Sequence, residues 1–279
     1  YITIFGSLPR RRSQEDTPTT SASQTNNKKF VNPHPGVPRK LCAVHHGISA
    51  LAIVAAILSG PLYWPTFALT TFTILYSDIY SAILHCSLDD KRCLSIPIIG
   101  TVAKGFQDHH DFPIASTQGK GLYWLMCDTV RIQWIIMACA LMFGRWRYNL
   151  FLVLMLKQVF CAYGTQVGHY YAHATPDRIP GVVRVLQRMH LLLPPAHHWQ
   201  HHKAPYECNF GIVNGLSNFF LNFPLRDLYK FEVVMVAWAV LTLFDIAIIE
   251  RVYTALTTTH PPRAPPAPAI SNHLFNYFY

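Results

Sequence analysis

The sequence predicts an all-α integral membrane protein, with about four transmembrane helices in two hairpins and a histidine-rich metal-binding cap on one side. Three observations lead to this fold class. The 279 residues are 51% hydrophobic and 13% charged, whereas a soluble domain carries about 25% charged residues. Several apolar runs are long enough to cross a bilayer. Fifteen histidines crowd into the polar segments and the adjoining ends of the apolar runs.

The charge and cysteine content narrow the classes of partner. The net charge of +9 suits a protein that lies beside anionic lipid head groups. Nucleic acid is not expected as a partner, because the basic residues do not form one patch with interleaved aromatic residues. The seven cysteines include no CxxC pair and lie mostly in apolar stretches, which favours reduced, packed thiols over disulfides.

Composition divides the chain into three parts. Residues 1–40 are polar, basic and poor in acids, which is typical of an organelle transit peptide; a disordered cytosolic tail explains them equally well. Residues 41–257 form the expected membrane domain. Residues 258–279 are rich in proline and are expected to be a disordered tail.

The membrane domain contains two predicted hairpins. Residues 41–60 and 62–88 are apolar and are separated by a short Gly-Pro turn. Residues 121–143 and 149–174 are also apolar and flank the short loop "GRWRYN". At about 1.5 Å per residue, each run reaches across about 30 Å of hydrocarbon.

Two further segments have a helical pattern but are not assigned as spans. Residues 180–193 predict an amphipathic helix on the membrane surface, with Arg184 and Arg188 opposite apolar residues at helical spacing, namely Val182, Val185, Leu186, Met189 and Leu193. Residues 231–244 form an apolar run that is short for a span. They are either a buried or interfacial helix or a fifth crossing.

The topology brings distant histidines to one side of the membrane. An even number of crossings places the polar segments 89–120 and 175–230 on the side of residues 1–40, together with most of the Lys and Arg, as the positive-inside rule expects. Four histidine clusters then meet on that face: His85; His109 and His110; His169 and His173; and His197, His198, His201 and His202.

Local spacing supports this convergence. His169 and His173 are four residues apart and share one helix face, as His85 and Asp89 do. Asp78 lies two helical turns before His85, inside an apolar run. A carboxylate is costly there and is expected to be functional, for example by orienting a metal-binding imidazole.

Eight or more imidazoles exceed the four ligands of one tetrahedral zinc and suit two metal ions with open positions. Nitrogen-rich ligation admits Fe, Zn, Cu or Ni. Zinc hydrolysis is disfavoured, because only Glu207 lies near a cluster and could act as a base. A paired iron site beside a bilayer would suit O₂ activation and attack on a lipid C–H bond.

Four stretches carry a resemblance to a known family: "SDIYSAILHCSLDD", "FQDHHDFP", "QVGHYYAHA" and "IPGVVRVLQRMHLLLPPAHHWQHHKAPYECNFGIVNGLSN". They resemble the Kua-type lipid desaturase family over roughly residues 70–260. That family includes plasmanylethanolamine desaturases and the plant plastid palmitoyl-phosphatidylglycerol desaturase, and the last stretch looks more like the plastid branch.

The resemblance implies an O₂-dependent desaturase that introduces a double bond into a phospholipid chain. It implies two iron ions held by His85, His109, His110, His169, His173, His198, His201 and His202, with Asp78, Asp89 and Asn218 as supporting residues behind these ligands. It also implies an electron donor, cytochrome b5 or ferredoxin, and location in a plastid membrane, with the endoplasmic reticulum as the alternative.

The chain departs from the family pattern at a few positions. Cys86 follows the first histidine, at a position where the family usually has Trp. Ala82 occupies the position of the small residue in the family's Ser-Gly pair. The segment "DFPIASTQGKG" after His110 also differs. We expect this segment to face the substrate, so the identity of the lipid stays open.

Other functions fit parts of the pattern. A lipid hydroxylase would use the same ligands, whereas a histidine-rich metal transporter or a bis-His haem protein would use them without lipid chemistry. His197 is either beside a ligand or exposed. The remaining histidines are expected to be interface or tail residues, namely His34, His45, His46, His190, His260 and His273.

Overall fold

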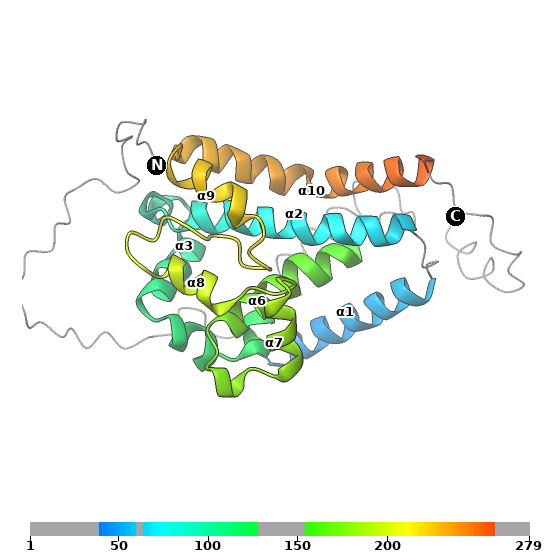
Figure 1. The fold of residues 1–279 in the computed structure, drawn as a ribbon, viewed down its shortest axis with the longest axis horizontal. Coiled ribbons are helices and arrows are strands. Elements are labelled where there is room, and N and C mark those ends of the chain that lie inside the picture. The colour runs from blue at the N-terminus through cyan, green and yellow to red at the C-terminus, as the bar shows by residue number, and fades with distance from the viewer. Residues whose placement is uncertain (1–38, 60–63, 128–153, 260–279) are drawn as a thin grey trace, which may run out of the picture.

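The computed structural model describes residues 39–59, 64–127 and 154–259. Within these ranges every regular element is a helix, and no strand occurs among them (Figure 1). The all-α prediction is therefore confirmed for this part of the chain. The predicted leader and the proline-rich tail lie almost entirely outside the described residues.

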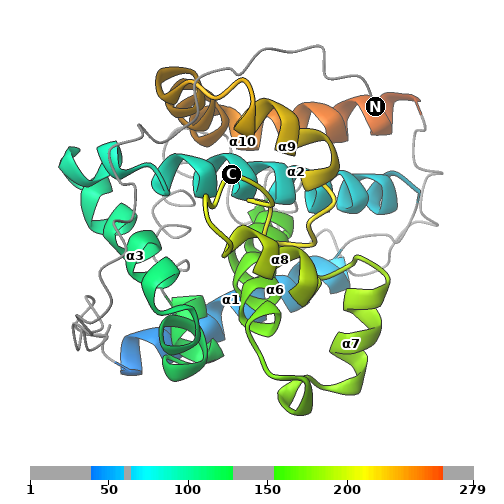
Figure 2. The same cartoon turned by 60° about the vertical axis from the view of Figure 1, so that its left-hand side comes forward.

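Three long helices form the apolar body. They are α1 (Arg39–Ser59), α2 (Trp64–Leu88) and α10 (Phe231–Thr259). Helices α2 and α10 lie side by side in both views (Figures 1 and 2). Near the start of α2, Leu69 packs with Tyr253, and near its end Cys86 packs with Val234. These contacts run in opposite order along the two helices, so the pair is antiparallel.

The expected number of membrane spans is only partly met. In α2, Phe67–Leu88 is long and apolar enough to cross a bilayer. Helix α10 passes the same test only if its halves, Phe231–Phe244 and Ile246–Thr258, count as one span despite a 58° bend. The apolar part of α1 is shorter. About half of the second predicted hairpin, residues 128–153, lies outside the described part, so the count of four is not confirmed.

Shorter helices form a cap around the C-terminal end of α2, where α3, α6 and α9 pack against it (Figure 2). The α-helices of the cap are α3 (Ile99–Asp111), α6 (Thr165–Ala172), α7 (Gly181–Arg188), α8 (Pro195–His201) and α9 (Asn218–Arg226). Between them lie the 3₁₀ turns η1 (Lys91–Ser95) and η4 (Pro176–Arg178) and the π-helical segments η2 (Ala115–Gly119) and η3 (Gln158–Gly164).

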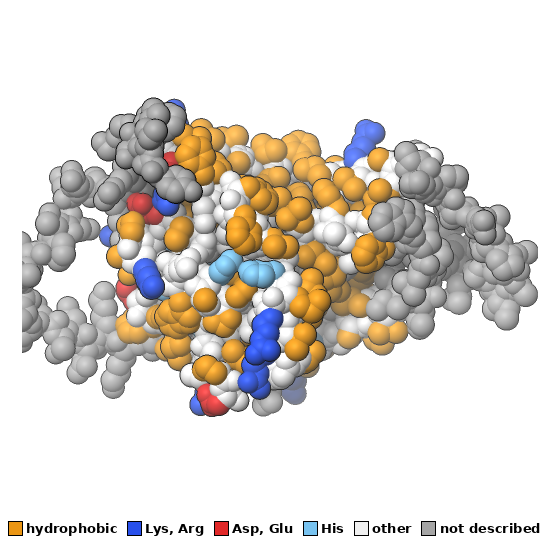
Figure 3. All heavy atoms as spheres, in the orientation of Figure 1, with side chains coloured by type: hydrophobic (Ala, Val, Ile, Leu, Met, Phe, Trp, Pro, Cys, Tyr) orange, Lys and Arg blue, Asp and Glu red, His pale blue; other side chains and the backbone are white. Residues whose placement is uncertain are grey.

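Helix α7 is shorter than predicted. It ends at Arg188, and the chain turns at His190, whose φ is 54°, so Leu193 leaves the predicted stripe and is fully buried. Val182, Val185 and Met189 remain exposed. On the face drawn in Figure 3, Lys and Arg side chains run over α7, whereas hydrophobic side chains dominate over α2 and α10.

The cysteine prediction needs a correction. Cys42 of α1 forms a disulfide with Cys127, and the two Cα atoms are 5.8 Å apart, within the usual range for such a bridge. The two cysteines are separated by 85 residues, so no local sequence motif indicates that they form a disulfide. Among the described residues, Cys86, Cys93, Cys161 and Cys208 lie outside this bridge as thiols, as expected.

Candidate metal centre

All eight histidines of the predicted ligand set converge in the cap. They come from four helices that are far apart in the sequence: His85 from α2, His109 and His110 from α3, His169 and His173 from α6 and its C-cap, and His198, His201 and His202 from α8 and its C-cap. Helix geometry positions His169 and His173 together, because residues four apart on a helix project from the same face. The convergence that topology predicted is therefore present.

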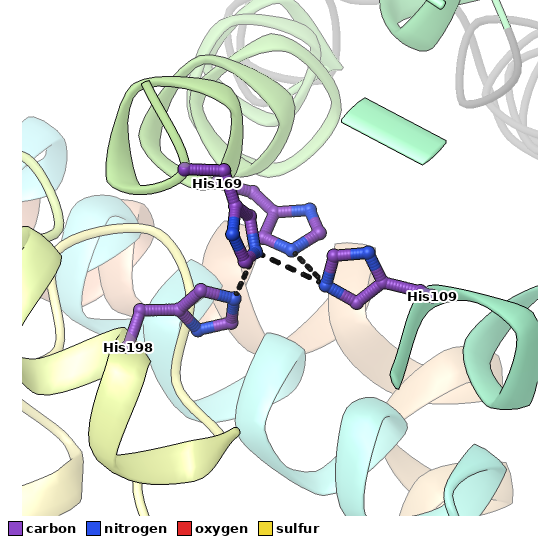
Figure 4. A group of neighbouring side chains, drawn as sticks. His109, His169 and His198 are labelled. Atoms are coloured by element: carbon purple, nitrogen blue, oxygen red, sulfur yellow. Dashed lines mark hydrogen bonds between the residues drawn. The ribbon is translucent and has the colours of Figure 1, made fainter. Parts of the chain in front are cut away.

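The side chains divide into two groups. The first histidine group consists of His109, His169, His173 and His198. The Nε2 atom of His109 lies 2.9 Å from that of His169 and 3.1 Å from that of His173. The Nε2 atoms of His173 and His198 are 2.8 Å apart, so the ring nitrogens point toward one common position (Figure 4).

These distances fit ligands around a cation. Two nitrogens about 2.1 Å from one metal ion, at a right angle, lie about 3.0 Å apart. A chain of hydrogen bonds explains the arrangement less well, because His109 Nε2 faces two other Nε2 atoms and carries at most one proton.

The second histidine group consists of His85, Asp89, His110 and His201. The Nε2 atoms of His110 and His201 are 3.0 Å apart. Asp89 was expected behind the ligands, but its carboxylate lies among the ring nitrogens, 3.3 Å from His201, 3.4 Å from His110 and 3.6 Å from His85. A carboxylate in this position could itself bind a metal ion.

Unsatisfied buried atoms also indicate a ligand in the second group. His85 Nε2 and both carboxylate oxygens of Asp89 are buried and have no hydrogen-bond partner among the described residues. Leaving such groups unpaired costs about 1–3 kcal/mol each, and a bound cation would satisfy all three. The residues therefore fit a metal site on the chemistry of their donors.

His202 lies between the two groups. Its Nε2 atom is 3.1 Å from that of His198 in the first group, and its ring centroid is 5.3 Å from that of His110 in the second. The two groups thus adjoin each other and form one paired centre.

Hydrogen bonds on the far side of several rings fix their orientation. The Nδ1 atom of His85 donates to the Phe210 carbonyl oxygen at 3.1 Å, and that of His201 donates to the Cys208 carbonyl oxygen at 2.8 Å. A carbonyl oxygen only accepts, so the proton of each neutral ring is on Nδ1, and the Nε2 lone pair faces the group.

Burial favours the neutral form that binds metals in several of the imidazoles. Desolvation, followed by the nearby histidines, lowers the pKa of His109 and His198 well below the usual value. The same causes lower the pKa of His202 to about 3. Burial alone would raise the pKa of Asp89, but the neighbouring His85 and His201 lower it overall, so its carboxylate is ionised.

Asp78 and Asn218, which were expected to support the ligands, bind a backbone segment rather than the imidazoles. Asp78 accepts hydrogen bonds from Ser217 and from the backbone of 213–217, rather than orienting a ring directly. Asn218 accepts from the Gly211 N–H at 2.7 Å and donates to the Gly211 carbonyl. Both residues therefore hold the segment that follows α8.

The structure also places His197 and two residues whose contacts the sequence patterns did not reveal, whereas His34, His260 and His273 lie outside the described residues. His197 contacts His190 at a centroid distance of 5.2 Å, outside both groups. Ser116 lies within hydrogen-bond distance of His109 Nδ1, at 2.7 Å, and Tyr206 stacks on His110 at 4.9 Å. Tyr206 belongs to the "HHKAPY" stretch, whereas Ser116 lies in the segment "DFPIASTQGKG", which we expected to face the substrate.

Comparison with known proteins gives related sequences. Fatty acid desaturase 4, chloroplastic, of Arabidopsis thaliana is 31% identical over 144 residues, 52% of this chain and 44% of the relative. Plasmanylethanolamine desaturase 1 of Mus musculus is 29% identical over 54% of this chain and 57% of its own length. The plasmanylethanolamine desaturase of Myxococcus xanthus is 29% identical, over 63% and 62%.

The chain spans about half the length of three curated relatives that it matches, the chloroplastic fatty acid desaturases of Arabidopsis thaliana. No solved structure matches it. The family model described as the lipid desaturase domain matches residues 74–239, which is more than half of the chain and includes both histidine groups. The chain therefore belongs to the lipid desaturase domain family, in agreement with the resemblance carried by its histidine motifs.

Proposed function

We propose that the protein is an O₂-dependent membrane lipid desaturase with two iron ions, one in each histidine group. The observation that carries this proposal is the meeting of seven histidines and Asp89 in two adjoining, largely buried groups, with His202 between them, inside the matched lipid desaturase domain. When bound, paired iron would supply the O₂ chemistry that side chains alone lack.

The proposed reaction balances as an oxidation of the lipid. One hydrogen leaves each of two adjacent methylene carbons, and a carbon–carbon double bond forms between them. These two hydrogens, two electrons from a carrier protein and two protons reduce one O₂ to two molecules of water. The electron donor is proposed to be cytochrome b5 or ferredoxin.

The side chains would bind and orient the metal ions and keep water out. His85 and His201 are held by backbone carbonyls, so their Nε2 atoms are already directed before a metal binds. Asp89 would contribute negative charge against the two cations. His173, His198 and His201 have at most 1% of their surface exposed, which limits access of bulk water to the centre.

Exposed apolar side chains support a membrane location. Such residues line the outer surfaces of the long helices: Val44, Ile48, Leu51 and Val54 on α1, Phe67 and Leu75 on α2, and Val233, Val236, Val240, Leu243 and Phe244 on α10. Large exposed apolar surfaces on a protein often mark contact with a membrane or a partner. Lipid around these helices would place an acyl chain beside the cap.

The relatives guide the choice of lipid and compartment. One relative is named as a chloroplastic fatty acid desaturase and another as a plasmanylethanolamine desaturase. The substrate is therefore proposed to be an acyl or alkyl chain of a phospholipid. A plastid membrane is favoured because three of the relatives are described as chloroplastic, with the endoplasmic reticulum as the alternative.

Lipid analysis of cells that express the chain tests this proposal. A desaturase yields lipids that have lost two hydrogens, whereas a hydroxylase on the same ligands yields lipids that have gained one oxygen. His201→Ala should abolish the product. His197→Ala is a matched control from the same segment, outside both groups, and should retain it. New lipids that are identical in cells with the intact chain and with His201→Ala would reject the metal assignment.

A further inference from the structure

One face of α2 binds a continuous piece of backbone. Asp78, Ser81 and His85 are three and four residues apart and so form one stripe along the helix. Asp78 binds residues 213–217, Ser81 Oγ accepts from the Ile212 N–H at 3.1 Å, and His85 donates to the Phe210 carbonyl. The segment 208–218, which we call the strut, therefore runs along two turns of α2 in the opposite direction.

Asp78 is the main attachment of the strut. Its side chain is completely buried. Its Oδ1 atom accepts from the backbone N–H groups of Val213, Asn214 and Gly215 at 3.0, 3.0 and 3.1 Å. Its Oδ2 atom accepts from the N–H of Ser217 at 2.8 Å and from its hydroxyl at 2.6 Å. Converging N–H groups of this kind form a binding site for an anion.

The backbone of the strut has the curvature that this attachment needs. Gly215 has a φ of +78°, which glycine adopts without the steric cost that a Cβ would bring. Asn218 closes the loop by binding both the N–H and the carbonyl of Gly211. The loop thus presents five donors to one carboxylate, and no other residue of this α2 stripe is bound in that way.

The other end of the strut orients the second histidine group. The carbonyl of Cys208 accepts from His201 and that of Phe210 accepts from His85. Of the first group, His109 is hydrogen-bonded through Nδ1 to Ser116 of η2. Among the described residues, the strut therefore binds two rings of the second group by hydrogen bonds, whereas its contact with α6, which carries His169 and His173, is by packing.

From this arrangement we infer that Asp78 is a positioning residue for the second metal ion alone. The carboxylate anchors the strut, and the strut carbonyls direct His85 and His201. The inference rests on the proposed function, because it assumes that each group binds one metal ion. Loss of the anchor should weaken the second site and leave the first occupied.

The experiment compares metal content and histidine accessibility in purified full-length protein. Asp78→Asn keeps the size of the side chain, but its amide nitrogen faces N–H donors. We expect the iron content to fall from two ions per chain to one, because removing such supporting partners typically weakens a metal site by about 10- to 100-fold. Modification with diethyl pyrocarbonate, read by mass spectrometry, should increase at His85, His110 and His201 and stay unchanged in the first group.

Thr73→Val is the matched control. Thr73 is also completely buried on α2, but its hydroxyl binds only the Leu69 carbonyl of the same helix. This variant should keep both metal ions. If Asp78→Asn does not fold, Ser81→Ala removes a weaker attachment of the strut, and chelator competition should then show weaker binding at one of the two sites.

The outcomes separate this inference from the proposed function. If the intact protein binds no metal, the proposed function fails and the inference fails with it. If the intact protein binds two ions and folded Asp78→Asn also binds two, with unchanged modification, only the inference is overturned. Loss of both ions from folded Asp78→Asn also overturns it, because the effect would not be specific to the second group. Unchanged metal affinities in Ser81→Ala would overturn it as well.

Discussion

Asp89 changes the electrostatics of the centre. It is the only carboxylate in the two histidine groups, and its ionised form places one negative charge among neutral imidazoles. Spacing identified it as a partner of His85, but its approach to His110 and His201 depends on how α3 and α8 pack against α2. Sequence spacing along one helix carries no information about these contacts, which explains why its position among the ring nitrogens was missed.

Acid should destabilise the metal-free protein through these histidines. In the unfolded chain a histidine has a pKa near 6.5, whereas the pKa of His202 is about 3 in the folded protein. Between these values the unfolded state binds more protons, so stability falls as the pH falls through this window. The melting temperature of the metal-free protein should therefore decrease from pH 7 to pH 5.

His202→Asn supplies the comparison for this experiment. Without the titrating ring, the melting temperature should decrease less steeply over the same pH range. Equal slopes for the variant and the intact protein, measured by thermal unfolding in a chelating buffer, would contradict the prediction.

At the scale of elements, α6 depends on a close approach to the strut. A Cβ added to Gly168 would lie 2.5 Å from the carbonyl oxygen of Val213 and 2.7 Å from that of Ile212. Both obstacles are backbone atoms, and the strut is held against α2 on its other side. A side chain at position 168 therefore has no simple way to relax.

Gly168→Ala should lower the free energy of unfolding by about 1–3 kcal/mol, the usual cost of overpacking. Gly105→Ala is the control, because Gly105 lies in helix α3 and has nothing within 4 Å of an added Cβ. That substitution should leave stability unchanged or raise it by up to about 1 kcal/mol. Similar thermal unfolding of the two variants would contradict the proposed contact.

The long helices were the most predictable elements. Their apolar runs located α1 and α2 to within a few residues, because a continuous apolar run of about twenty residues satisfies its backbone within a bilayer by forming a helix. The run from Phe231 was ambiguous, since the helix continues past a bend that the hydropathy pattern does not mark. Helix α7 ended early because His190 adopts a positive φ, which a periodic pattern of apolar residues cannot reveal.

At the scale of the whole molecule, neighbouring histidines serve different groups. His109 belongs to the first group and His110 to the second, and His198 and His201 divide in the same way. Adjacent residues on a helix point about 100° apart, so His109 and His110 leave α3 in different directions, whereas His198 and His201 are three residues apart on α8 and still join different groups. Topology predicted that the histidines meet, but only the packing angles of the helices decide which ring joins which group.

This division predicts separable metal loss. His109→Ala should remove the ion of the first group and His110→Ala that of the second, so each variant should retain one iron and the double variant none. Iron analysis of the purified proteins, with circular dichroism to verify folding, measures this. Complete loss of iron from either folded single variant would show that the groups do not bind independently.

The same feature ties the spacing of the two sites to the backbone itself. His109 and His110 are adjacent, yet their rings belong to different groups. The distance between the two metal sites is therefore set by one residue step of a rigid helix rather than by a flexible hinge. Inserting one alanine between His109 and His110 would rotate the following residues of the helix by more than a quarter turn. The two rings could then no longer enter both groups at once.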